Sequence, residues 1–321
     1  MTMLPFEEYS RLIADAIANL QFSQSPASLF EPIRYTLDSG GKRLRPALLL
    51  STYHALGGDP ADVMNQALGL EMFHNFTLLH DDVMDNADVR RGQLTVHRRW
   101  NASQAILSGD AMLTIATQLI ADCKPDALPR ILSLFNDTAM DIYRGQQLDI
   151  DYEHRRDVTI DEYISMIRLK TSVLLGCACA MGANLADAHS SVCQAFYDYG
   201  VNLGLAFQLR DDYLDTYGDP LLFGKGIGGD IVNEKKTWLF ITALQERGEQ
   251  LSAILSQKLD PSDRVAAVID IYDSINLGER CNGLIAQYLD KALVAIGRAG
   301  IAPEALQFFT DLAQRSASRT H

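Results

Sequence analysis

Hydrophobic residues recur along the chain with the spacing of amphipathic and buried helices. From Phe6 to Leu20 the apolar side chains return every three or four positions, which places them on one side of a helix. Alternating runs, which are typical of half-buried strands, are hard to find. Turn signals are sparse, and Asp59-Pro60 and Asp260-Pro261 are typical of helix starts. The pattern predicts an all-α protein, and because no Ser/Gly-rich or Pro-rich linker divides it, we expect residues 1–321 to form a single domain.

Two segments are apolar on every side, and each ends in aspartates. Residues 61–85 and 201–215 leave no broad polar face, which is typical of buried helices. The first ends in Asp81-Asp82-Val83-Met84-Asp85 and the second in Asp211-Asp212-Tyr213-Leu214-Asp215. Positions i and i+4 share a helix face, so Asp81 points with Asp85, and Asp211 with Asp215. Like charges at this spacing repel, and the helix dipole disfavours anions at a C-terminus, so each pair calls for a cation.

Magnesium is the cation that fits these two motifs. Carboxylate oxygens are hard ligands, and Mg²⁺ typically binds one or two of them together with water and substrate phosphates. Neither motif has the DxDxDG pattern of a calcium loop. A single DDxxD is more often a solvated helix end, but two such motifs on very apolar helices predict a metal-bridged polyphosphate held between them.

Composition narrows the function classes. The chain has 321 residues, 47% of them hydrophobic, with 28 Lys and Arg against 41 Asp and Glu, a net charge of −13. This balance is typical of a globular protein and excludes a basic nucleic-acid-binding surface. The five cysteines form no CxxC pair, so we expect reduced thiols in a cytoplasmic protein. The N-terminus has no secretory signal pattern, and the charge-free run 171–186 is shorter than the ~20 residues of a membrane span, so we expect a buried helix there and no span.

Basic residues gather beside both acidic motifs. Gly40-Gly41-Lys42-Arg43-Leu44-Arg45-Pro46 sets three cations behind a glycine turn that permits close approach of the backbone. The other basic positions are Arg90-Arg91, Lys170, Lys225 and Lys235-Lys236. In an acidic chain this grouping indicates an anion bound together with metal ions. Alone, the first cluster is also compatible with a solvated surface, and His74, two turns before Asp81, with a hydrogen-bonded core histidine.

Together these motifs resemble the trans-isoprenyl diphosphate synthase (polyprenyl synthetase) family, of the short-chain farnesyl or geranylgeranyl type. The ordered series is GGKRLRP, His74, DDVMD, RRG, GQQLD (145–149), KT, Gln208 with DDYLD, FGK and KKT. The resemblance implies mostly antiparallel helices around a central apolar cavity, the isoprenoid synthase fold, in a homodimer. It implies a Mg²⁺-dependent transferase that condenses isopentenyl diphosphate head to tail with dimethylallyl, geranyl or farnesyl diphosphate.

The resemblance also implies a role for each motif residue. Three Mg²⁺ would be bound by Asp81, Asp85 and Asp211, supported by Asp82, Asp212 and Asp215. The allylic diphosphate would be bound by Arg90, Lys170, Lys225 and Lys235, and isopentenyl diphosphate by Gly41, Lys42, Arg45, His74 and Arg91. Lys170, Thr171 and Gln208 would be catalytic, the last two facing the developing allylic cation. The stretch 225–235 is one residue longer than in some farnesyl synthases, which leaves Lys235 and Lys236 as alternatives.

Product length is expected to depend on Phe76 and Thr77, five and four residues before Asp81. In the family a bulky residue at the first position is the floor of the chain-elongation cavity, and Phe followed by a small residue resembles twenty-carbon synthases. We expect a product of fifteen or twenty carbons, with twenty favoured, although Phe76 is also compatible with plain core packing. Two other functions stay open: a terpene cyclase, and a non-catalytic subunit of a heteromeric prenyl synthase.

Overall fold

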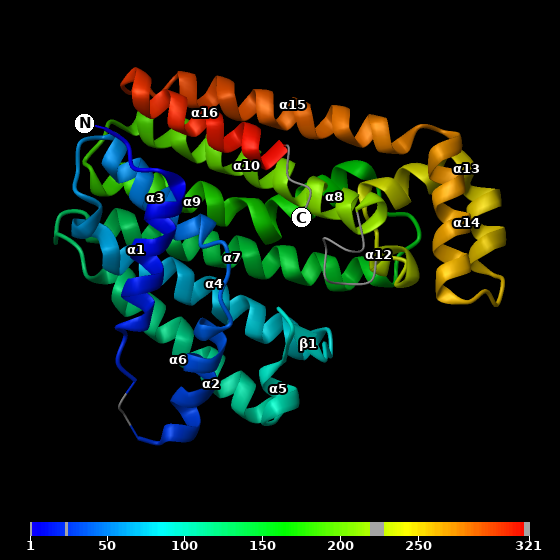
Figure 1. The fold of residues 1–321 in the computed structure, drawn as a ribbon, viewed down its shortest axis with the longest axis horizontal. Helices are drawn as coiled ribbons and strands as arrows, with labels where there is room; N and C mark the ends of the chain where they lie inside the picture. The colour runs from blue at the N-terminus through cyan, green and yellow to red at the C-terminus, as the bar shows by residue number, and fades with distance from the viewer. Residues whose placement is uncertain (1, 23–24, 219–227, 318–321) are drawn as a thin grey trace. The chain divides into compact units, whose positions relative to one another are not determined.

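The computed structural model describes residues 2–22, 25–218 and 228–317. They are almost entirely helical (Figure 1), which confirms the all-α prediction. The elements are α1 (Phe6–Ala18), α2 (Ala27–Asp38), α3 (Leu44–Ala55), the 3₁₀ turn η1 (Pro60–Val63), α4 (Met64–Met84), β1 (Val89–Arg90), β2 (Gln93–Leu94), α5 (Val96–Arg99), α6 (Ala102–Ala121), α7 (Leu128–Glu153), α8 (Ile160–Ile167), the π turn η2 (Arg168–Ser172), α9 (Val173–Leu185), α10 (Ser190–Tyr217), α12 (Gly229–Val232), α13 (Trp238–Leu255), α14 (Pro261–Ser274), α15 (Leu277–Gly297) and α16 (Pro303–Ala317).

The chain divides into two compact units. The first unit contains residues Met1–Phe135 and Ala178–Cys193, and the second contains Asn136–Cys177 and Gln194–His321. The boundaries fall within α7, α9 and α10. The single domain over 1–321 and its central cavity stay predictions.

The first unit is organised around α4. This helix packs along α6 and against α3, while α1 packs on α3 and α2 on α6. As its composition predicts, α4 is buried on nearly every side, including Leu70, Phe73 and Phe76. Burial of such side chains is the main favourable contribution to folding. The predicted start at Asp59-Pro60 is confirmed, because the Asp59 carboxylate accepts a hydrogen bond from the Ala61 amide and Pro60 begins η1.

Two short strands follow α4 and were not predicted. In β1 and β2, Val89 pairs with Leu94 and Arg90 with Gln93 in an antiparallel hairpin. Arg91 (φ 51°) and Gly92 (φ 77°) make its turn. Strands of two residues are too short to show a period in the sequence. The hairpin carries Arg90 and Arg91 away from the end of α4.

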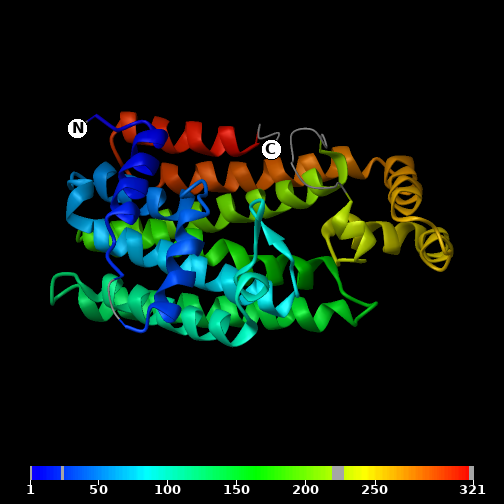
Figure 2. The same cartoon turned by 60° about the horizontal axis from the view of Figure 1, so that its bottom comes forward.

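Long helices also build the second unit. The pairs α15–α16 and α13–α14 each lie side by side, and both pairs are visible in the two views (Figure 1 and Figure 2). The predicted helix start at Asp260-Pro261 is confirmed by α14. Residues Ile160–Leu185 are long and apolar enough for a membrane span by length and composition, but 67% of their most apolar window is buried inside the protein. This burial agrees with the core helix expected there.

Candidate functional site

The first aspartate motif closes α4. Met84 is the last helical residue and Asp85 follows it as the C-cap, with its amide bonded to the Asp81 carbonyl oxygen at 2.8 Å. Asp85 is exposed and Asp81 half-buried. This exposure leaves the end of α4 accessible to a cation, and the left-handed Asn86 (φ 53°) then turns the chain into the hairpin.

Asp82 has a different environment from its two neighbours. It is 5% exposed, and its Oδ1 accepts from Arg90 Nε at 2.7 Å. Burial raises the pKa of the Asp82 carboxyl, although Arg90 opposes the shift. Asp82 therefore holds Arg90 beside the motif.

The glycine turn before α3 is built for close contact with Arg91. Gly40 (φ 79°) and Gly41 (φ 143°) adopt backbone conformations that favour glycine. The Arg91 guanidinium donates to the Gly40 carbonyl oxygen and, at 3.3 Å, to Ser39 Oγ. A Cβ on Gly41 would lie 3.0 Å from that guanidinium. The hairpin turn and the glycine turn are thereby joined.

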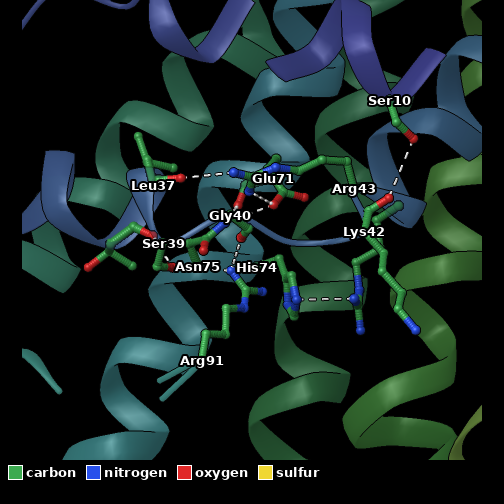
Figure 3. A network of polar contacts seen from close by, with 12 residues as sticks. Ser10, Leu37, Ser39, Gly40, Lys42, Arg43, Glu71, His74, Asn75 and Arg91 are labelled. Carbon is green, nitrogen blue, oxygen red and sulfur yellow. Dashed lines mark hydrogen bonds and ion pairs between the residues drawn. The ribbon is translucent and has the colours of Figure 1, made fainter. Parts of the chain in front are cut away.

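Arg45 and His74 form the next part of this cluster, whose side chains are drawn in Figure 3. Arg45 NH1 lies 3.1 Å from His74 Nε2. Burial, together with Arg45, Arg91, Arg90 and Arg43, holds the pKa of His74 well below its usual value. The imidazole is therefore neutral, and its Nε2 accepts from the guanidinium. The structure thus brings together Gly41, Arg45, His74 and Arg91, and the exposed Lys42 extends from the same turn.

The second aspartate motif lies in the last two turns of α10. Asp212 is 4% exposed, and its carboxylate accepts from Gln208 Nε2 at 2.9 Å and from the Tyr163 hydroxyl of α8. Burial raises the pKa of Asp212 to about 7. Gln208 Oε1 in turn accepts from Thr171 Oγ1 at 3.1 Å. This chain of hydrogen bonds fixes which way the Gln208 amide points.

Asp215 and Lys235 meet across Asp230. The Asp230 amide donates to Asp215 Oδ2 at 2.8 Å, and Lys235 Nζ lies 3.6 Å from Asp230 Oδ1. Burial lowers the pKa of Lys235, but the surrounding carboxylates, Asp230 first, more than offset it and raise the pKa, so the ammonium stays charged. Lys236 instead donates to the Glu234 carbonyl oxygen at 2.6 Å. Of the two alternatives, Lys235 is the one that lies beside the acidic group.

Lys170 and Thr171 lie on a π turn between α8 and α9. Lys170 Nζ contacts Asp149 Oδ2 of α7 at 2.6 Å. A Cβ on Gly145 would lie 2.3 Å from the Lys170 amide nitrogen, and one on Gly204 would lie 2.6 Å from the Ser172 Cα. Two glycines therefore let α7 and α10 approach the backbone of η2. π turns are frequent at functional sites because they redirect side chains within a helix.

Phe76 and Thr77 lie one turn before the first motif. Phe76 is 6% exposed, with its ring centroid 4.7 Å from that of His80 and 5.6 Å from that of Phe73. Thr77 Oγ1 donates to the His74 carbonyl oxygen at 2.8 Å, so its small side chain lies against its own helix. Lys225, the remaining predicted site residue, lies outside the described residues.

The carboxylates suit a metal completed by substrate. Among the residues the structure describes, no three His, Cys, Asp or Glu side chains group closely enough to hold a metal ion. Each motif offers a pair, Asp81 with Asp85 or Asp211 with Asp215, and Mg²⁺ typically uses one or two carboxylates plus phosphate oxygens. The donor set therefore fits Mg²⁺. The first motif belongs to the first unit and the second motif to the second, so their predicted opposition stays a prediction.

Tyr163 is the polar partner of the site that sequence reasoning missed. It is 1% exposed and 49 residues from Asp212, and neither its neighbours nor its spacing distinguishes it from a core tyrosine. Asp149 and Asp230 were visible within the acidic and basic runs, but the sequence offered no reason to pair them with Lys170 and Lys235.

Comparisons with known proteins agree with this geometry. The polyprenyl synthetase family model matches residues 26–272. A short chain isoprenyl diphosphate synthase of Methanothermobacter thermautotrophicus is 33% identical over 309 residues, 95% of each chain. A geranylgeranyl diphosphate synthase of Methanosarcina mazei is 39% identical over 70% of each chain. A crystal structure of a geranylgeranyl pyrophosphate synthase, 40% identical, matches with a TM-score of 0.95 over 99% of this chain and all of its own.

Proposed function

The chain belongs to the polyprenyl synthetase family, and we propose that it condenses isopentenyl diphosphate head to tail with an allylic diphosphate, stopping at the twenty-carbon product. It is a prenyltransferase of the prenyl diphosphate synthase type. The observation that carries the proposal is a carboxylate pair in each unit, beside basic groups suited to phosphate. Asp81 and Asp85 lie beside the Arg90–Arg91 hairpin, and Asp211 and Asp215 beside Lys235.

Metal binding is proposed for both motifs. Asp81 and Asp85 would hold two Mg²⁺ and Asp211 a third, with Asp82, Asp212 and Asp215 supporting them. Bound Mg²⁺ neutralises the charge that develops on a departing diphosphate. Such stabilisation is the largest catalytic contribution expected here.

Two sets of cations would hold the two substrates. Arg90, Lys170, Lys225 and Lys235 are proposed for the allylic diphosphate. Three of them contact a carboxylate in the structure: Arg90 with Asp82, Lys170 with Asp149, and Lys235 with Asp230. Those contacts hold the side chains in place until phosphate oxygens replace or join the carboxylates. Gly41, Lys42, Arg45, His74 and Arg91 are proposed for isopentenyl diphosphate.

The carbon chemistry would take place beside Thr171 and Gln208. When the allylic carbon–oxygen bond breaks, the electron pair leaves with the diphosphate and a cation remains. Gln208 donates through its nitrogen to Asp212, so its oxygen is the atom available toward Thr171 and the cation. The isopentenyl double bond attacks the cation, and the released proton goes to the departing diphosphate. Buried apolar helices such as α4 and α10 exclude the water that would quench the cation.

Product length would be limited by Phe76, with the small Thr77 beside it. A relative 39% identical is named geranylgeranyl diphosphate synthase, which supports twenty carbons over fifteen. We also propose a homodimer in the cytoplasm. Ile106 and Leu107 of α6 are 46% and 59% exposed, an apolar surface that a second copy would cover. All five cysteines are free thiols, which suits a reducing compartment.

A product assay tests this function. Purified protein is given labelled isopentenyl diphosphate with dimethylallyl, geranyl or farnesyl diphosphate, with and without Mg²⁺, and the dephosphorylated products are sized. We expect Mg²⁺-dependent elongation ending at twenty carbons, lost in Asp81→Asn and retained in the exposed control Asp15→Asn. A cyclised hydrocarbon would indicate a terpene cyclase. No elongation by folded protein would indicate a non-catalytic subunit.

A further inference from the structure

A buried ion pair lies beneath the glycine turn. Arg43 and Glu71 contact each other with side chains only 7% and 4% exposed. Arg43 NH2 also donates to the Leu37 carbonyl oxygen at 2.8 Å, and Glu71 Oε1 also accepts from Asn75 Nδ2 at 3.0 Å. One guanidinium thereby joins the turn to the end of α2 and to the middle of α4 (Figure 3).

The backbone at Arg43 needs such an anchor. Arg43 is the N-cap of α3 with φ 50° and ψ 32°, a left-handed conformation that is unfavourable for a residue with a side chain. Its side chain makes no capping bond to the helix. The contact with Glu71 compensates for this conformation, because surrounding structure is what retains such residues.

The consequence is a division of labour among three neighbouring cations. Arg43 is directed to Glu71, while the Lys42 side chain extends away from it (Figure 3). Arg45, one turn into α3, reaches His74 at 3.1 Å. Both donor directions of Arg43 are used, by Glu71 and by the Leu37 carbonyl, so its guanidinium is not presented to a phosphate.

The ion pair also sets the position of α4 against the turn. Glu71 and His74 are three residues apart on α4, so they lie on the same side of that helix. Movement of the turn relative to Glu71 would therefore change the contact between Arg45 and His74. Glu71 also balances one positive charge in a cluster that includes Arg45, Arg90 and Arg91.

We propose that Arg43 and Glu71 are positioning residues for the isopentenyl diphosphate subsite. They do not touch the substrate; they fix the turn so that Lys42, Arg45 and His74 present their nitrogens to one diphosphate. This inference rests on the proposed function, since it assumes that these residues bind isopentenyl diphosphate.

The test compares both substrates in one variant. Glu71→Gln should raise KM for isopentenyl diphosphate about tenfold, the factor expected when one charged hydrogen bond to the substrate is lost. KM for the allylic diphosphate and kcat should change less than about threefold, because the other cations are untouched. The control Arg34→Met removes an arginine that donates to the Ile17 carbonyl oxygen in the same unit, and should leave both KM values unchanged.

A double variant separates positioning from charge burial. Arg43→Met with Glu71→Met removes both charges, and replacing a buried ion pair in this way is often neutral for stability. We expect its melting temperature to recover while KM for isopentenyl diphosphate stays raised. Return of that KM to the wild-type value would overturn the proposal, as would equal changes in KM for both substrates.

Calorimetric binding of isopentenyl diphosphate distinguishes failure of this inference from failure of the proposed function. A wild-type chain that binds it without elongation would refute the function, and an about tenfold weaker Kd in Glu71→Gln would still support positioning. A wild-type enzyme that elongates, with the same Kd and KM in Glu71→Gln, would refute positioning alone. A wild-type chain that does not bind isopentenyl diphosphate would refute both.

Discussion

Substitution of Phe76 by Ala tests the proposed limit on product length. The Phe76 ring is 6% exposed and packs edge-on against His80, so its loss opens space inside the protein. The deleted ring is roughly the size of one prenyl unit, and we therefore expect the main product to lengthen by about one unit. Deletion of a buried phenyl ring costs about 3–5 kcal/mol of stability, and an elongated product that fills the space recovers part of it.

The assay is chromatographic sizing of products from labelled isopentenyl diphosphate. Thr77→Phe should have the opposite effect, because a second aromatic ring fills the space beside the first and stops elongation earlier. Phe30→Ala is the matched control: it deletes the same ring from a position in α2 that is 9% exposed, with a similar loss of stability. An unchanged product length in folded Phe76→Ala, or lengthening in Phe30→Ala, would refute the reasoning.

Three further predictions follow from the second unit and the metal site. Gly145→Ala places a Cβ 2.3 Å from the backbone nitrogen of Lys170, so kcat should fall at least about tenfold, whereas Gly283→Ala, with no atom within 4 Å, should keep wild-type kcat; equal rates would contradict the close approach. Burial raises the pKa of Asp212 to about 7 from about 3.9 in the unfolded chain, so the folded state alone holds the proton between these values, and metal-free stability should fall as pH rises through that window and level off above it. Urea unfolding at several pH values checks this, and Asp212→Asn should flatten the slope; an equal slope in the variant would assign it to other groups. Mg²⁺ with inorganic diphosphate should raise the melting temperature more than Mg²⁺ alone, and Asp81→Asn should remove the difference; a shift retained in the variant would argue against that ligand.

Sequence reasoning succeeded where one segment carried the signal. The apolar helices and their terminal aspartates were predicted because periodicity and charge lie within α4 and α10 themselves. It failed where the signal is tertiary. The run from Thr171 predicted a regular helix, but the π turn at its start accompanies the approach of Gly145 and Gly204 from other helices.

Long-range polar pairs were equally hidden. Glu71 lies inside an apolar helix, 28 residues from Arg43, and the sequence treated Arg43 as one more phosphate-binding cation. Tyr163 and Asp212 are 49 residues apart. A sequence pattern reports which residues could be charged partners, but only packing decides which of several cations takes the buried carboxylate.

The π turn at Arg168–Ser172 constrains how this part of the chain can change in length. A π turn is a helical turn that contains one additional residue, so the α-helices before and after it are out of phase by about 100° relative to a continuous helix. Deletion of one residue there would restore a regular helix and rotate everything that follows. Val173 and Leu174, now 0% and 2% exposed, would leave the positions in which they pack. Point substitutions near Lys170 can thus be absorbed by this segment, whereas loss or gain of a single residue would turn the wrong face of α9 inward.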